Sequence, residues 1–169
     1  AAMPTELVPA LEPVVKSIEE LTVRIRHCDA YVKELSERKY PETEGLRAIP
    51  GVGPITALAY VLTLEEPARF GKSREVGPFL GLTPRRDQSG QVDKQLRITK
   101  AGNAYLRRLL VQCANYVLGR HGPDCDLRRF GLKLAERGGK NAKRRAVVAV
   151  ARKLGVLLHC LWKTGGAYE

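Results

Sequence analysis

The fold is decided around residues 81–110, GLTPRRDQSGQVDKQLRITKAGNAYLRRLL. Pro84 and Gly90 interrupt any helix in its first half, and the residues after Gly90 alternate in polarity. This pattern predicts an extended basic loop or a short β-hairpin over residues 81–98. Two acidic residues stand against seven basic ones, which are Arg85, Arg86, Lys94, Arg97, Lys100, Arg107 and Arg108. Such a surplus of positive charge suits a polyphosphate ligand.

Ser89 lies at the centre of this basic stretch. A serine hydroxyl is a weak nucleophile at neutral pH, and its attack on a phosphodiester builds negative charge on the phosphate oxygens. Neighbouring arginines hold the phosphate bidentately and stabilise that charge, and each well-placed donor contributes about 3 kcal/mol. Ser89 is therefore a candidate catalytic nucleophile. The alternative is an ordinary turn residue in a solvated basic loop.

A glycine-rich turn precedes this stretch, in IPGVGPITA at residues 49–57. Gly51 and Gly53 permit a tight turn, and Pro54 suits the first position of a following helix. The pattern predicts a helix-hairpin-helix motif over residues 46–64, with Gly51 and Gly53 close to a nucleic-acid phosphate. The alternative is a tight turn between two helices that pack together.

The N-terminal part of the chain carries a heptad pattern over residues 11–39. Apolar residues alternate at spacings of three and four: Leu11, Val14, Ile18, Leu21, Ile25, Cys28, Val32 and Leu35. A narrow stripe of this kind predicts a coiled-coil helix through which the chain forms a homo-oligomer. The alternative is an amphipathic helix that packs on its own domain. Residues 1–10 are expected to be flexible or left over from expression.

The residues after 101 predict a set of basic helices that ends near residue 163. Thr99 is expected to cap the first of these helices, and Asn103 either contributes to the cap or contacts a phosphate. Two further helices are expected at residues 124–136 and 141–163. The last one starts with a second basic cluster, formed by Lys143, Arg144 and Arg145. This cluster binds nucleic acid or is simply a solvated helix end.

The positive charge is unevenly distributed along the chain, which has a net charge of +11 at pH 7. Residues 1–45 contain six basic and nine acidic residues, so their net charge is −3. Residues 46–169 contain 23 basic and nine acidic residues, so theirs is +14. The second part is therefore expected to bind DNA or RNA. Six phosphate contacts would make log affinity fall with log salt at a slope of about −5.

Other classes of protein fit the sequence less well. No apolar run approaches the length of about 18 residues that a membrane span requires, and no signal peptide opens the chain, so we expect a cytoplasmic protein without a membrane partner. Four scattered cysteines and three histidines show no ligand spacing, so no metal site and no bound cofactor are expected in this chain.

Three segments together carry a resemblance to a known family. They are IPGVGPITA at residues 49–57, GPFLGLTPRRDQSG at residues 77–90 and RITKAGNAYLRRLL at residues 97–110. In this order they resemble the C-terminal domain of the IS-one-ten family of insertion-sequence transposases, which are bridge-RNA-guided DNA recombinases. The matching segments lie within residues 46–118, and the helical tail that follows fits less specifically.

The resemblance implies a function for this chain as one part of a transposase. Ser89 would be the serine nucleophile of strand cleavage and exchange, and DNA and a guide RNA would be the partners. Family members also carry an N-terminal RuvC-like domain with four metal-binding acidic residues, and nothing in this sequence corresponds to that domain. Mg²⁺ is therefore expected in the missing domain, and this chain alone is expected to be inactive.

The predicted fold class is mainly α. A long N-terminal coiled-coil helix, residues 11–40, precedes a compact helical domain, residues 46–169, which contains the helix-hairpin-helix motif and the serine loop. A function of a different class also fits this organisation: a non-catalytic helix-hairpin-helix module that only clamps DNA and multimerises. A third hypothesis is an RNA-binding scaffold.

Overall fold

The computed structural model describes residues 7–89 and 92–168, without the side chains of residues 87–95. The described chain is mainly helical and has one two-stranded sheet, as the sequence predicts. In order, its elements are α1 (Val8–Lys39), α2 (Thr43–Arg47), α3 (Pro54–Leu64), the 3₁₀ turns η2 (Pro67–Arg69) and η3 (Ser73–Glu75), α4 (Val76–Phe79), β1 (Pro84–Ser89), β2 (Val92–Ile98), α5 (Ala104–Leu118), α6 (Asp126–Glu136) and α7 (Ala142–Thr164).

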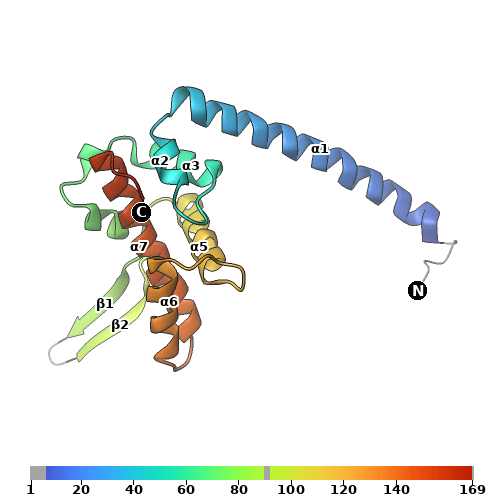
Figure 1. The fold of residues 1–169 in the computed structure, drawn as a ribbon. Helices are drawn as coiled ribbons and strands as arrows, with labels where there is room; N and C mark the ends of the chain where they lie inside the picture. Colours follow the sequence, from blue (N-terminus) through green and yellow to red (C-terminus); the bar gives the residue numbers. More distant parts are fainter. Residues whose placement is uncertain (1–6, 90–91, 169) are drawn as a thin grey trace.

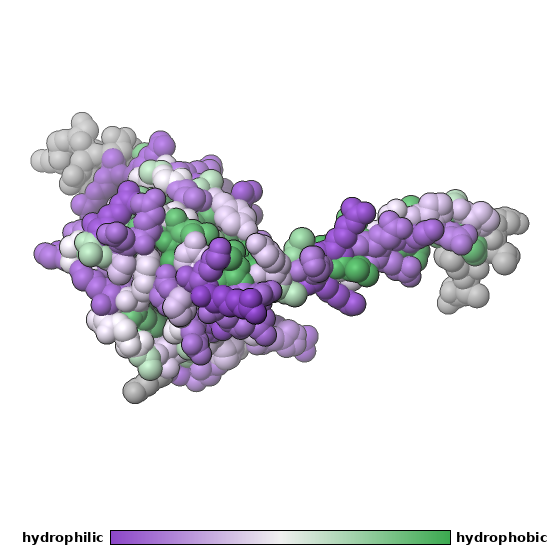
Figure 2. All heavy atoms as spheres, turned by 90° about the horizontal axis from the view of Figure 1, so that it is seen from above, coloured by the Kyte–Doolittle hydropathy of each residue, from purple (hydrophilic) through white to green (hydrophobic). Residues whose placement is uncertain are grey.

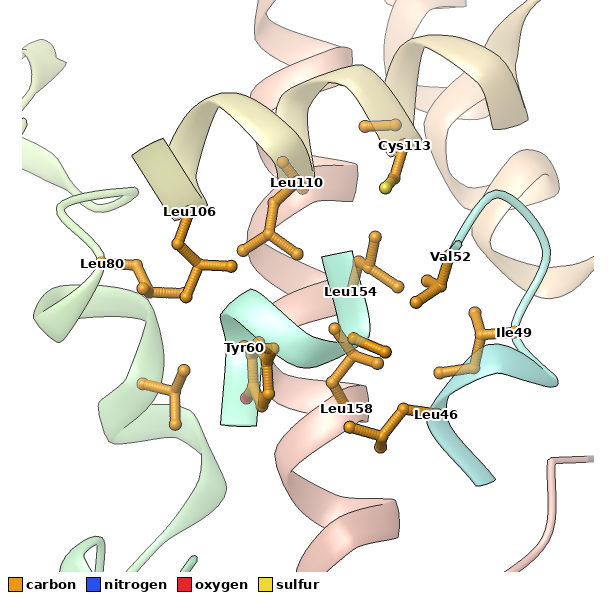
Figure 3. Packing of buried hydrophobic residues seen from close by; sticks show 14 of the residues in the cluster. Leu46, Ile49, Val52, Tyr60, Leu80, Leu106, Leu110, Cys113, Leu154 and Leu158 are labelled. Atoms are coloured by element: carbon orange, nitrogen blue, oxygen red, sulfur yellow. The ribbon is translucent and has the colours of Figure 1, made fainter. Parts of the chain in front are cut away.

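Helix α7 runs through the middle of the domain, and α2, α4, α5 and α6 pack against it (Figure 1). Leu154 and Leu158 of α7 are fully buried and face Leu110 of α5 and Tyr60 of α3 (Figure 3). The Tyr60 hydroxyl donates a hydrogen bond of 2.6 Å to the carbonyl oxygen of Gly155. Burial raises the pKa of Tyr60, so the phenol stays protonated and remains a donor. These contacts fix α3 against the centre of α7.

Helix α1 leaves the domain as an extended arm (Figures 1 and 2). It begins at Val8, three residues before the predicted start, and its predicted apolar stripe is largely open to solvent. Ile18 and Ile25 are 57% and 59% exposed, whereas Val32 and Leu35 are half-buried. The alternative in which this helix packs along its own domain is therefore wrong for residues 8–31.

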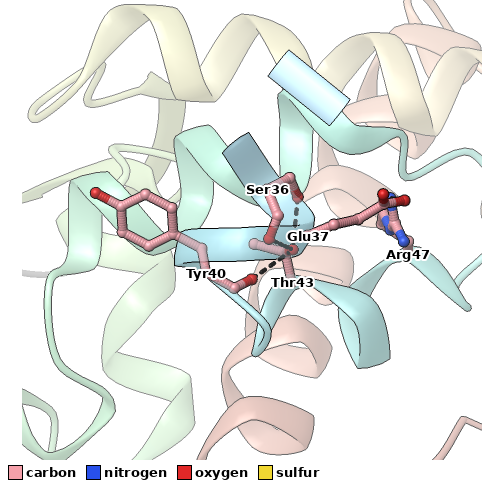
Figure 4. A network of polar contacts seen from close by, with 5 residues as sticks. All are labelled: Ser36, Glu37, Tyr40, Thr43 and Arg47. Carbon is pink, nitrogen blue, oxygen red and sulfur yellow. Dashed lines mark hydrogen bonds and ion pairs between the residues drawn. The ribbon is translucent and has the colours of Figure 1, made fainter. Parts of the chain in front are cut away.

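A small polar network fixes the end of α1 to α2 (Figure 4). Ser36 is fully buried, and its hydroxyl lies 2.6 Å from the hydroxyl of Thr43. Thr43 in turn donates to the carbonyl oxygen of Tyr40 at 2.7 Å. Glu37 and Arg47 form an ion pair of 3.5 Å beside them. Buried hydroxyl groups need such partners, so this network fixes the direction in which α1 leaves the domain.

The two predicted alternatives for residues 81–98 resolve as a β-hairpin. Strands β1 and β2 are antiparallel, Ser89 is paired with Val92, and the register shifts between Pro84 and Arg86. The hairpin projects from the domain beside α6 (Figure 1). Residues 81–89 and 92–98 thus form an arm with a defined direction.

The base of the hairpin is a close contact between two backbone segments. Gly81 and Gly102 both have positive φ angles, 66° and 71°. A Cβ atom on Gly81 would overlap backbone atoms of Lys100 and Ala101, and one on Gly102 would overlap the carbonyl oxygen of Phe79. Only glycine has both the backbone freedom and the small volume that these positions require.

The residue that caps the N-terminus of α5 is not the predicted Thr99. Asn103, and not Thr99, is the N-cap residue: its Oδ1 accepts hydrogen bonds from the backbone amides of Tyr105 at 2.9 Å and Leu106 at 3.0 Å. Thr99 instead lies in the base of the hairpin, where its amide donates to the carbonyl oxygen of Thr83 at 2.9 Å. The prediction that Thr99 caps this helix was therefore wrong.

Replacing Gly102 with alanine tests the close contact at the base of the hairpin. We expect the free energy of unfolding to fall by about 3 kcal/mol, because the added methyl group overlaps a carbonyl oxygen and the φ angle is unfavourable. Chemical denaturation measures this change. Gly45→Ala is the control, since nothing lies within 4 Å of its Cβ position. Equal stability of the two variants would contradict this description of the base.

Candidate nucleic-acid interface

A groove lies between the base of the hairpin and the helices α6 and α7. Its volume is about 870 Å³. One side is formed by residues of β2 and the segment after it, and the other side by residues of α6 and α7. Of the described side chains, seven basic ones line it: Arg97, Lys100, Arg137, Arg144, Arg145, Arg152 and Lys153. The fold thus brings Arg97 and Lys100 into one groove with Arg144 and Arg145, which stand more than forty residues later in the sequence.

The described residues do not neutralise the charges of this groove. Among the side chains that the structure describes, no acidic one lines it, and none of the seven basic residues forms an ion pair. Like charges held close together repel one another and destabilise the folded chain unless an anion binds between them. The groove is therefore the strongest candidate for an anion-binding site on the described surface.

The second basic cluster is placed at the groove by the start of α7. Arg144 and Arg145 are exposed and line the groove, and Arg145 Nη2 also donates to the carbonyl oxygen of Gly138 at 3.3 Å. Lys143 is exposed as well but does not line the groove. The start of α7 thus contributes two of its three predicted residues to the groove.

The sequence prediction missed three basic residues of the groove. Arg152 and Lys153 lie two turns further along α7, and Arg137 follows the end of α6. A signal for Arg152 was present in the sequence, because it stands seven residues after Arg145 and such residues share one face of a helix. No comparable pattern marks Arg137, which reaches the groove only through the packing of α6 on α7.

The hairpin carries the predicted serine at its far end. Ser89 is the last residue of β1, and the side chains of Ser89 and Lys94 lie outside the described residues. Arg86 and Arg97 are exposed on the two strands. Arg85 is also exposed, and its Nη2 lies 3.5 Å from the carbonyl oxygen of Thr99. The strand that ends at Ser89 thus begins beside the basic groove.

Arg107 and Arg108 were both predicted to contact phosphate, but the structure gives them different surroundings. Arg107 is half-buried, and its Nη1 donates to the carbonyl oxygens of Leu80 at 3.0 Å and Ala101 at 2.8 Å. It therefore joins the two segments that form the base of the hairpin. Arg108 is exposed on the same helix.

The two glycines of the predicted hairpin turn also differ. Gly51 has a φ angle of 84° and packs against α5, since its Cβ position lies 3.0 Å from Tyr116 Cδ1 and 3.2 Å from the carbonyl oxygen of Cys113. Nothing lies within 4 Å of the Cβ position of Gly53. A shallow hollow of about 530 Å³ borders this turn. Close packing on α5 therefore explains why a glycine stands at position 51. The surface at Gly53 remains open to a ligand.

Asp124 and Asp126, near the start of α6, are both paired with one arginine. Arg129 donates to Asp124 at 2.6 Å and to Asp126 at 2.9 Å, and its hydrogen bond to Asp126 is the main cause of the raised pKa of Arg129. Among the described residues, no group of three or more His, Cys, Asp and Glu side chains is placed to hold a metal ion. No helix in the described ranges has the length and apolar character of a membrane span.

Comparison with known proteins places the chain in the class of insertion-sequence transposases. Residues 43–128, half of the chain, match the transposase IS116/IS110/IS902 family, and the chain belongs to this family. The transposase for insertion sequence element IS1111A of Coxiella burnetii is 33% identical over 159 residues, which are 92% of this chain and 43% of that protein.

Two other relatives extend this comparison. A protein of Pseudomonas aeruginosa described as a probable family 20 transposase is 29% identical over 174 residues, covering 99% of this chain and 51% of that protein. The transposase for insertion sequence element IS1328 of Yersinia enterocolitica is 40% identical over 75 residues, covering 44% of this chain and 22% of that protein. The chain thus spans about half the length of the first two relatives.

Replacing Arg107 with alanine tests its role at the base of the hairpin. We expect the free energy of unfolding to fall by about 1–3 kcal/mol, because two carbonyl oxygens lose a charged donor. Amide exchange at Thr99 and Lys100, which bond to the opposite segment, should also become faster. Arg108→Ala is the matched control and should change stability by less than about 0.5 kcal/mol. An equal loss of stability in Arg107→Ala and Arg108→Ala would show that Arg107 has no special role in holding the hairpin.

Proposed function

We propose that this chain is the part of a DNA transposase that holds nucleic acid in its basic groove and supplies Ser89 as the nucleophile of strand exchange. One observation carries this proposal: the strand that ends at Ser89 begins beside a groove whose described lining has seven basic side chains and no acidic one. A phosphodiester backbone bound along the groove would supply negative charge that balances these basic side chains. Membership of a transposase family supports DNA as the partner.

The proposed reaction is a transfer of a phosphoryl group to serine and back. The Ser89 hydroxyl loses its proton, its Oγ forms a bond to phosphorus, and the bond from phosphorus to a deoxyribose oxygen breaks. The released oxygen takes up a proton and becomes a free hydroxyl end. Attack of another DNA hydroxyl on the phosphoserine rejoins the strand and restores the serine. The covalent link conserves the phosphodiester energy, so the exchange needs no ATP.

Basic residues near the hairpin would assist this transfer. Arg85, Arg86, Arg97 and Lys100 are exposed, and an arginine can hold a phosphate oxygen bidentately as charge grows on it. Arg107 would act indirectly, because it holds the base of the hairpin and thereby the direction of the strand that carries Ser89. Lys143, Arg144 and Arg145 would bind the nucleic acid further from the reacting phosphate.

We also propose that the complete transposase contains parts beyond this chain. A RuvC-like domain with four acidic residues would bind Mg²⁺ and act on the same DNA, and a guide RNA would select the sites. Another subunit of a multimer would supply that domain to this serine. The isolated chain would then bind nucleic acid but cut it poorly or not at all, and it would act in the cytoplasm, on chromosomal DNA.

Helix α1 would assemble this multimer. Its stripe from Leu11 to Ile25 consists of large apolar side chains that are 40–59% exposed. A second copy of the helix would remove these side chains from water, and the alternating spacing of three and four residues fits a helical partner. The chain would thus be a homo-oligomer through residues 11–39.

A second candidate function is a non-catalytic module that clamps DNA and multimerises. The open Gly53 at the start of α3 favours it, because amides at a helix N-terminus can contact a phosphate without any chemistry. The two candidate functions differ in the role of Ser89, which is the nucleophile in the first and has no catalytic role in the second. In the clamp, all the chemistry would lie in the remainder of the transposase.

Replacing Ser89 with alanine in the full-length transposase separates the two functions. With guide RNA, donor and target DNA present, we expect the wild type to give a protein-linked DNA band on a denaturing gel and Ser89→Ala to give none. Ser17→Ala, which changes an exposed serine on α1, is the control and should keep the band. Recombination that survives Ser89→Ala, without a covalent band in the wild type, would support the clamp instead.

Charged residues in the apolar stripe test the assembly by α1. Ile18→Glu and Ile25→Glu together should convert the oligomer of this chain to a monomer in light scattering, because they place carboxylates in the helix–helix seam. Val23→Glu is the control, since Val23 is 65% exposed but lies off the stripe. A chain that is already monomeric, or an oligomer that persists in the double variant, would contradict assembly through this helix.

A further inference from the structure

We propose that the groove between the hairpin and α6–α7 holds an unpaired stretch of DNA, with its bases on an apolar floor and its phosphates on the basic rim. This inference rests on the proposed function and specifies the form of the nucleic acid that the groove accepts. The strand would pass between β2 on one side and α7 on the other.

Apolar residues, which we call the floor, share the lining of the groove with the basic side chains, which we call the rim. Besides the basic side chains, its lining includes the hairpin residues Leu82, Pro84, Leu96 and Ile98 and the helix residues Phe130, Leu134, Ala146, Val148, Ala149 and Val156. Leu96 is 50% exposed, although it lies within a surface of high charge. A double helix offers mainly phosphates and sugars to a protein surface, and such contacts are polar. Unpaired bases offer flat apolar faces, which match this floor.

The size of the groove also favours a single strand. A volume of about 870 Å³ is within the range of pockets that enclose small molecules and cofactors. A few nucleotides fit such a space, whereas a duplex would have to lie across its mouth. The groove therefore suits a short stretch of unpaired nucleotides within a longer nucleic acid.

The kind of positive charge favours nucleic acid over an acidic protein segment. Five of the seven basic residues are arginines, whose planar guanidinium groups bind phosphate bidentately and also stack on bases. One apolar ring of the floor already has a cation against it, because Lys153 Nζ lies 4.6 Å from the centre of the Phe130 ring. The groove thus combines stacking surfaces and phosphate donors over a short distance.

The lining gives no preference for RNA. No described side chain that lines the groove has a hydrogen-bond acceptor, so none of them can accept a hydrogen bond from a ribose 2′-hydroxyl. The proposed reaction also requires DNA beside this hairpin. We therefore assign the groove to a DNA strand and not to a guide RNA.

The test measures binding of short labelled oligonucleotides to this chain by fluorescence anisotropy. Four ligands of equal length are compared: single-stranded DNA, the same strand without bases, duplex DNA and single-stranded RNA. Leu96→Ser removes one apolar contact of the floor, and Leu62→Ser on α3 is the matched control, because both leucines are 50% exposed. Arg144→Gln with Arg145→Gln removes charge from the rim, and Arg74→Gln is the control outside the groove.

We expect Leu96→Ser to weaken binding of single-stranded DNA about tenfold and to leave the strand without bases unchanged, because only the former stacks on the floor. The rim variant should weaken both strands. The inference would be overturned if duplex DNA bound as tightly as single-stranded DNA, if Leu62→Ser matched Leu96→Ser, or if RNA bound clearly more tightly than DNA. In these cases a loss of affinity in the rim variant would still support the proposed function.

Two further outcomes concern the occupant itself. No effect of the rim variant on any oligonucleotide would overturn both the inference and the proposed binding of nucleic acid in the groove. An acidic amphipathic peptide that displaces labelled DNA at lower concentration than unlabelled DNA would show that the groove is a protein-docking site. Circular dichroism of each variant confirms that it is folded before its affinity is compared.

Discussion

The burial of one face of α7 is the constraint on which the rest of the structure depends. Val150, Leu154 and Leu158 are fully buried there, and each buried aliphatic side chain contributes about 1.5–3 kcal/mol. Helices α5 and α6 are held in place because they pack on α7, and α3 is linked to it by the hydrogen bond from Tyr60 to the carbonyl oxygen of Gly155. The helix therefore organises the core and, on its other side, presents charged residues to the groove.

The position of the candidate site follows from this arrangement. Because α7 passes beside the base of the hairpin, Arg144 and Arg145 lie across a groove from Arg97 and Lys100. Close backbone contact at Gly102 and the two hydrogen bonds of Arg107 determine the direction of the hairpin. A rigid core and a fixed hairpin base thus bring together residues that share no local motif.

Sequence patterns predicted the local features of this chain and not its long-range contacts. The heptad stripe, the basic clusters and the helices that include α5 and α7 follow from periodicity and charge. The alternation after Gly90 allowed either a loop or a hairpin, because strand pairing depends on neighbours that a single sequence does not show. Arg107 and Arg108 are equivalent in the sequence, yet only Arg107 faces the carbonyl oxygens of the hairpin base. Arg137 joins the groove through tertiary packing alone, for which the sequence carries no signal.

The salt dependence of single-stranded DNA binding tests the central claim that charges from both sides of the groove contact one nucleic acid. The measurement compares the slope of log affinity against log salt for the wild type and for a variant in which Arg97, Arg144 and Arg145 are all glutamine. We expect the slope to become less negative by about 2, because three phosphate contacts are lost. An unchanged slope would show that nucleic acid does not bind in this groove.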